Sequence, residues 1–119
     1  MPSILLVEDE ELLRTTLTFL LTGEGYEVLE ASDGQEAVDL FIQQPDAIDL
    51  VLSDLMMPRL NGLEMFRILK EVRPQVKLIL ITGMLNAAPA WREQGVHDLI
   101  AKPFEITHLL NKVAMAFTI

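Results

Sequence analysis

The chain alternates short, continuously apolar runs with longer stretches in which apolar residues recur every three or four positions. Apolar runs of this length are typical of strands, and the longer periodic stretches are typical of helices. The pattern predicts strands at 4–7, 26–31, 48–54, 76–82 and 98–101. It predicts helices at 10–25, 32–44, 63–72, 88–95 and 105–117.

Local signals set the ends of these helices. The first is expected to stop at Gly23 or Gly25, because glycine commonly terminates helices. The second opens with Ser32 and Gln35 at capping-box spacing. The third stops before a proline, and the fourth is expected to be short, with Pro89 in its first turn.

The strict alternation of strand and helix predicts a parallel sheet with helices on both faces, because right-handed crossovers place them there. Strands buried on both faces are apolar throughout, which puts 4–7, 48–54 and 76–82 in the middle. The more mixed runs 26–31 and 98–101 suit the edges. The expected fold class is therefore α/β: a flavodoxin-like (βα)5 three-layer sandwich with a parallel five-stranded sheet of order 2-1-3-4-5.

Composition indicates one globular domain over residues 1–119, with 50% hydrophobic and 23% charged residues. No apolar stretch is long enough to span a bilayer, and the N-terminus does not resemble a signal peptide. The absence of cysteine is consistent with a cytoplasmic location. A formal net charge of -9 argues against direct binding to nucleic acid or to an anionic membrane.

Polar residues follow four of the predicted strands at their carboxyl ends, where open α/β sheets bind ligands. These residues are Glu8, Asp9, Asp54, Thr82 and Lys102. Three carboxylates in one place repel one another unless a cation neutralises them, and Mg²⁺ suits such a site, with Mn²⁺ as a possible substitute. A lysine and a threonine beside them could hold a phosphoryl group on Asp54.

Each residue alone also has a structural explanation. Asp54 could cap the next segment, Thr82 could be structural, and Lys102 could be a surface lysine. Their joint occurrence at one end of the sheet favours a functional site. His97 and His108 are too isolated to indicate a metal site.

Four motifs in order resemble the receiver domain of two-component response regulators, over essentially the whole chain. They are "VEDE" after the first strand, "SDLMMPRLNG" around Asp54, "ITG" after the fourth strand and "AKPF" after the fifth. The resemblance implies that Asp54 accepts a phosphoryl group from a phosphohistidine and that the domain signals by a conformational change. The implied partner is a histidine kinase or a phosphotransfer domain.

The resemblance also implies a role for each site residue. Asp9 and Asp54 would ligate Mg²⁺ directly, with the backbone carbonyl of Met56 as a third protein ligand and Glu8 acting through water. Thr82 and Lys102 would contact phosphoryl oxygens, and the Lys102–Pro103 peptide would be cis. Catalysis would consist of positioning and charge neutralisation, in a domain that is not a conventional enzyme.

The sequence departs from the family pattern at several positions. Leu99 stands where an aromatic switch residue is common, and the stretch 82–95 is short. Both features resemble receiver modules of hybrid sensor histidine kinases, in which the native chain would be longer. Met56 and Met84 stand where side chains flank the attacking water, which predicts slow self-dephosphorylation. A homodimer would use the segments 88–95, 98–101 and 105–117.

Three other functions share parts of this pattern. An aspartate-nucleophile phosphatase of the haloacid-dehalogenase type needs a second aspartate at the position of Met56. A flavin-binding module would need a phosphate loop where this chain has the acidic "VEDEE". A degenerate receiver that acts only as an interaction platform stays open as an alternative.

Overall fold

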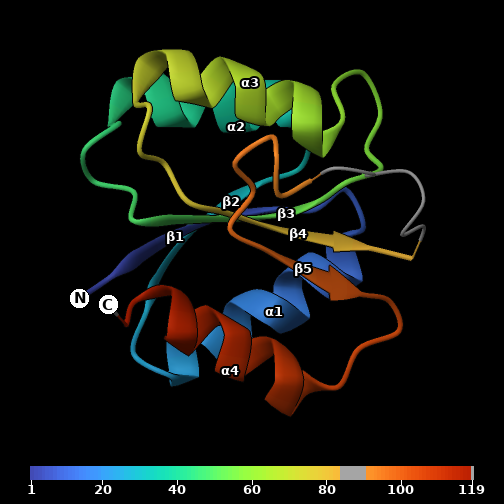
Figure 1. The fold of residues 1–119 in the computed structure, drawn as a ribbon. Helices are drawn as coiled ribbons and strands as arrows, with labels where there is room; N and C mark the ends of the chain where they lie inside the picture. The colour runs from blue at the N-terminus through green and yellow to red at the C-terminus, as the bar shows by residue number, and fades with distance from the viewer. Residues whose placement is uncertain (84–90, 119) are drawn as a thin grey trace.

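The computed structural model describes residues 1–83 and 91–118, which form a parallel sheet between two layers of helices (Figure 1). The strands are β1 (Ser3–Val7), β2 (Glu27–Ala31), β3 (Leu50–Asp54), β4 (Leu78–Thr82) and β5 (Asp98–Ala101). The helices are α1 (Glu11–Gly23), α2 (Gly34–Gln43), α3 (Gly62–Val72) and α4 (Ile106–Ala116). The strand order is β2-β1-β3-β4-β5 with every pair parallel, which confirms the predicted flavodoxin-like sheet.

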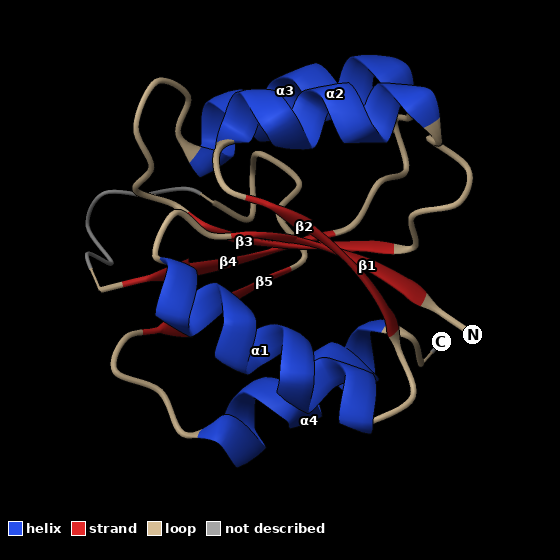
Figure 2. Ribbon diagram, turned by 180° about the vertical axis from the view of Figure 1, so that it is seen from behind, coloured by secondary structure: helices blue, strands red, loops and turns tan. Residues whose placement is uncertain are grey.

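Helices α2 and α3 cover one face of the sheet, and α1 and α4 cover the other (Figures 1 and 2). Each face has its own apolar core, and the central strands β3 and β4 are buried at every residue. The edge strand β2 has exposed residues at Glu27 and Glu30. The assignment of central and edge strands from their polarity is therefore confirmed. Within the described part of the chain, no helix is both long and apolar enough to cross a membrane.

The helix ends agree with the local signals except at α2. Helix α1 ends at Gly23, and α3 ends before Pro74, as predicted. The predicted cap at Ser32 is wrong by one residue, because Asp33 is the N-cap and accepts a hydrogen bond from the Glu36 backbone at 2.8 Å. A carboxylate makes a stronger, charge-assisted acceptor than a hydroxyl. The Ser32 backbone instead donates to the Glu36 side chain.

The predicted helix at 88–95 is not present where the structure describes it. Residues 91–95 form turns, closed by hydrogen bonds from Gly95 N–H to Arg92 O and from Val96 N–H to Trp91 O. These two bonds, with φ of 89° at Gly95, are typical of a helix end, and the described residues before it are turns. The rest of that prediction, including Pro89, lies outside the described residues. The last predicted helix is α4.

Candidate functional site

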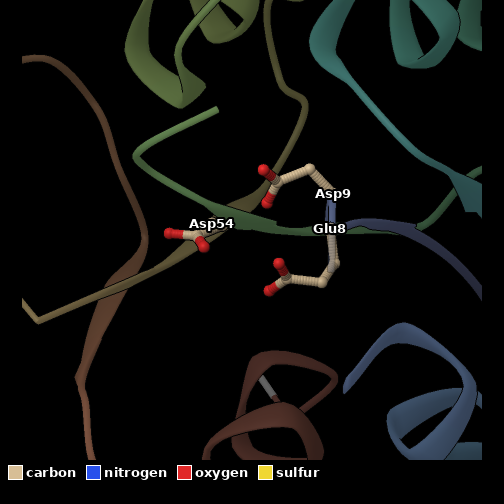
Figure 3. A group of neighbouring side chains, drawn as sticks. All are labelled: Glu8, Asp9 and Asp54. Atoms are coloured by element: carbon tan, nitrogen blue, oxygen red, sulfur yellow. The ribbon is translucent and has the colours of Figure 1, made fainter. Parts of the chain in front are cut away.

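Three carboxylates meet at the carboxyl ends of β1 and β3 (Figure 3). Glu8 and Asp9 follow β1, and the pairing of Val7 with Ser53 brings them beside Asp54 at the end of β3. One oxygen of each carboxylate lies within 4.8 Å of the others. Glu8 is 1% exposed and Asp54 is 7% exposed, whereas Asp9 faces solvent. The parallel register of two neighbouring strands therefore produces the cluster.

Lys102 adds a positive charge to this cluster from an edge of the sheet. It follows the edge strand β5, and its Nζ donates a hydrogen bond to Asp54 Oδ2 at 2.9 Å and lies 3.8 Å from Glu8 Oε1. Partial burial of the ammonium would lower the pKa of Lys102, but the hydrogen bond and the charge of Asp54 outweigh it and raise that pKa. Lys102 is therefore held protonated. The Lys102–Pro103 peptide is cis, as predicted.

Glu8 is the most deeply buried group of the cluster. Its Oε2 accepts a hydrogen bond from the Glu10 backbone at 3.1 Å, while its Oε1 is buried without a hydrogen-bond partner among the described residues. Burial, followed by the charge of Asp54, raises the pKa of Glu8 from 4.5 to about 7. Lys102 is the recorded cation beside Glu8 and Asp54, and a buried oxygen without a hydrogen bond is costly. The donor set fits a hard divalent cation such as Mg²⁺, which takes oxygen ligands.

The remaining predicted site residues lie at or near the same rim. Thr82 ends β4 and is 1% exposed, and its carbonyl accepts a hydrogen bond from the Lys102 backbone at 2.9 Å. The Met56 backbone N–H donates to Asp54 Oδ1 at 3.2 Å, so this residue stays beside the cluster. Leu99 instead packs against the core between the sheet and the α2–α3 layer. Met84 lies outside the described residues.

Sequence reasoning missed a residue that supports the cluster, Arg14 of α1. Its Nη1 donates to the backbone carbonyl of Glu8 at 2.8 Å, and its Nε lies 3.3 Å from a carboxylate oxygen of Glu30 on β2. Arg14 therefore ties the loop after β1 to both α1 and β2. The only sequence signal was a single basic residue within an amphipathic helix, which is too common to interpret.

Comparison with known proteins places this site in a family. The chain belongs to the response regulator receiver domain family, whose model matches residues 4–114. It is 38% identical over 116 residues to the CAI-1 autoinducer sensor kinase/phosphatase CqsS of Vibrio cholerae, which covers 93% of this chain. The resemblance drawn from the four motifs is confirmed.

Solved receiver structures share the fold over the whole chain. The non-phosphorylated receiver domain of HemR from Leptospira biflexa superposes with a TM-score of 0.92 at 31% identity, covering 100% of this chain and 96% of that one. The response regulator TrrA from Thermotoga maritima, in complex with Mg(2+)-BeF, gives 0.84 at 31% identity, covering 98% and 99%.

The curated relatives that match this chain in sequence are longer than the chain. The chain spans 17% of the Vibrio kinase and 48% of two curated response regulators that it also matches. Receiver domains act in two-component signalling, bind Mg²⁺ through acidic residues, and interact with histidine kinases or phosphotransfer proteins. The acidic cluster of this chain has the composition that this chemistry needs.

Proposed function

We propose that residues 1–119 form one receiver domain that accepts a phosphoryl group on Asp54 from a phosphohistidine in a Mg²⁺-dependent reaction. The observation that carries the proposal is the meeting of the Glu8, Asp9 and Asp54 carboxylates within 4.8 Å, with Lys102 Nζ 2.9 Å from Asp54. A buried strand ends on a charge here because that charge serves as a nucleophile.

The step forms one bond and breaks one. A carboxylate oxygen of Asp54 attacks phosphorus, and the P–N bond to the donor imidazole breaks, with its electron pair returning to the nitrogen. The product is an aspartyl phosphate. Attack of water on phosphorus later releases inorganic phosphate and restores the carboxylate.

The residues around Asp54 orient and neutralise the transferring group. Lys102 supplies a protonated amine already directed at Asp54 Oδ2, and Thr82 supplies a hydroxyl at the end of the intervening strand. Asp9, Asp54, the Met56 carbonyl and, through water, Glu8 would hold the metal, for which Mn²⁺ could substitute. When bound, Mg²⁺ supplies positive charge that offsets the carboxylates and the phosphoryl oxygens.

The proposal extends to output and partners. The donor would be a histidine kinase or a phosphotransfer domain, in the cytoplasm, and no direct contact with nucleic acid is expected from a net charge of -9. Leu99 would replace the usual aromatic in reporting phosphorylation, as in a hybrid-kinase module. Dimerisation would use β5 and α4 together with the segment 88–95. Dephosphorylation would be slow, because Met56 and Met84 cannot orient water well.

Intact-mass spectrometry with Mg²⁺ and acetyl phosphate tests the proposal. The wild type should gain one phosphoryl group and Asp54→Asn should gain none. Asp46→Asn, a change at an exposed aspartate outside the cluster, is the matched control and should be phosphorylated normally. Failure of the wild type to gain phosphate, with Mg²⁺ binding confirmed, would favour an interaction-only domain.

A further inference from the structure

The loop between β3 and α3, residues 55–61, contains an unusual backbone conformation at Arg59. Arg59 has φ of 69°, the one positive φ of a non-glycine residue within residues 1–83 and 91–118. A hydrogen bond of 2.8 Å from Leu60 N–H to Pro58 O spans it, as in a tight three-residue turn. A side-chain-bearing residue in this region is strained by about 1–3 kcal/mol, so surrounding contacts must hold it there.

The N-terminus of α2 provides those contacts. Arg59 Nη2 pairs with Asp33 Oδ2, while Asp33 Oδ1 accepts the capping hydrogen bond from the Glu36 backbone. The hydrogen bond from the Glu36 backbone lowers the pKa of Asp33 below its ordinary value, and the pairing with Arg59 lowers it further. Together they outweigh burial, which would raise that pKa. Leu60 lies against Gly34, where an added Cβ would sit 2.7 Å from Leu60 O. Consecutive loop residues thus meet consecutive residues of α2.

The same loop carries the backbone next to Asp54. Its ends are fixed by hydrogen bonds of 2.9 Å from Leu55 N–H to Ile81 O and from Gly62 N–H to Leu55 O. Between them, Met56 N–H reaches Asp54 Oδ1, Met57 Sδ lies 4.0 Å from Ser53 Oγ, and Arg59 pairs with Asp33 at the N-terminus of α2. The Arg59–Asp33 pair therefore restrains the same loop that carries the Met56 backbone.

We infer that Asp33 and Arg59 are positioning residues of the Mg²⁺ site, which hold the loop so that the Met56 backbone stays beside Asp54. The inference rests on the proposed function. The Arg59 side chain is 68% exposed, and exposed ion pairs contribute about 0–1 kcal/mol to stability. Loss of the pair should therefore change folding stability little, while it frees the loop beside the Mg²⁺ site.

Isothermal titration calorimetry with MgCl₂ on the whole chain tests this, with urea unfolding run in parallel. Arg59→Gly removes the pair and relieves the strained φ, so stability should hold or rise while the Mg²⁺ dissociation constant rises about three- to fivefold. Asp33→Asn keeps a good N-cap and loses the charge, and should weaken Mg²⁺ binding similarly. Arg67→Ala, at an exposed arginine of α3 that contacts Gln94, should match the wild type.

Two further measurements sharpen the test. The double variant should bind Mg²⁺ no more weakly than either single variant, because the two residues act as one unit. Hydrogen exchange at the Met56 amide, measured without metal, should speed up in both single variants and stay unchanged in Arg67→Ala. Normal Mg²⁺ binding by all variants, with a binding wild type, would overturn this inference alone. A wild type that binds no Mg²⁺ would overturn the proposed function as well.

Discussion

The two ends of the sheet treat charge differently. Among the described residues, the buried polar or charged side chains all lie at the carboxyl end: Glu8, Asp33, Ser53, Asp54 and Thr82. At the amino end, the charged residues Arg73, Lys77 and Asp98 each have a partner in the chain. One end is therefore built for a ligand and the other for stability.

At the amino end, several charged side chains have hydrogen-bond partners within the chain. Arg73 donates to the carbonyls of Pro45 and Ile48, and Lys77 donates to the carbonyl of Ala116 at 2.7 Å. Asp98, at the start of β5, accepts two hydrogen bonds from Lys112. An open hollow of about 520 Å³ lies at this end, lined in part by Arg73 and Lys77. Its cations are occupied by carbonyls, so size alone does not make it the functional site.

The carboxyl end is electrostatically incomplete. Glu8 Oε1 is buried without a hydrogen-bond partner, and within the described chain Lys102 is the one cation that makes ion pairs with Glu8 and Asp54. Buried charges that lack a full set of partners reduce stability. The difference teaches that this fold gives up stability at the end where a metal and a phosphoryl group are expected to supply the missing partners.

The largest expected loss of stability comes from adding a methyl group at Gly62, near the carboxyl ends of the strands. In Gly62→Ala, the new Cβ would sit 2.8 Å from both Asp54 O and Leu80 Cδ2, so β3 or α3 must move. We expect a loss of about 3 kcal/mol in urea unfolding, with weaker Mg²⁺ binding because Asp54 shifts. Gly23→Ala is the matched control: nothing lies within 4 Å of its added Cβ, and it should gain about 0.5–1 kcal/mol. A Gly62→Ala protein as stable as the wild type would show that the contact is loose.

The next effect has the opposite sign. Glu8→Gln removes a buried charge and offers an amide donor to Asp9, so the metal-free protein should become about 1–2 kcal/mol more stable at neutral pH. The stabilisation that MgCl₂ gives the wild type should shrink in the variant. Urea unfolding with and without Mg²⁺ measures both. Destabilisation of the metal-free variant would mean that the Glu8 charge is fully compensated. The two ends of the sheet would then not differ in the way described above.

A substitution at the amino end, Arg73→Met, should cause a smaller loss of stability. Arg73→Met keeps the apolar stem but leaves the carbonyls of Pro45 and Ile48 without this donor, at a cost of about 1 kcal/mol. Affinity for Mg²⁺ should stay at the wild-type value, because Arg73 lies at the opposite end of the strands. Calorimetry and urea unfolding on one preparation test the pair of expectations. A change in Mg²⁺ affinity would show that the two ends are coupled.

The smallest expected effect is a pH dependence of stability that arises from Asp98 at the amino end. Burial would raise the pKa of Asp98, but the hydrogen bonds from Lys112 and the Leu99 backbone outweigh it and lower that pKa. A lowered folded-state pKa means that the stabilisation is present above the ordinary pKa and is lost as pH falls through the folded value. The difference in unfolding free energy between the wild type and Lys112→Met should be about 0.5–1 kcal/mol near pH 6, and it should shrink as the pH falls below the ordinary aspartate value and through the lower folded pKa. A difference independent of pH would exclude the ion pair as its source.

Sequence patterns alone predicted much of this molecule, because the signals are local. Apolar runs and helical periodicity identified the strands and four helices, and generic parallel-sheet geometry then placed Glu8, Asp9, Asp54 and Lys102 at one edge. Their roles in phosphoryl transfer stay predictions. The choice between Ser32 and Asp33 as the cap of α2 could not be read, because both residues can cap a helix.

Only the tertiary structure showed how the site is supported. The contacts of Arg14 with Glu8 and Glu30, and of Arg59 with Asp33, join residues with no periodic relation along the chain. They depend on where loops and helix ends come to lie after the layers have packed, and on the reach of long side chains across those gaps. Residue types at strand ends are written in the sequence, whereas contacts between separate loops exist only once the chain has folded.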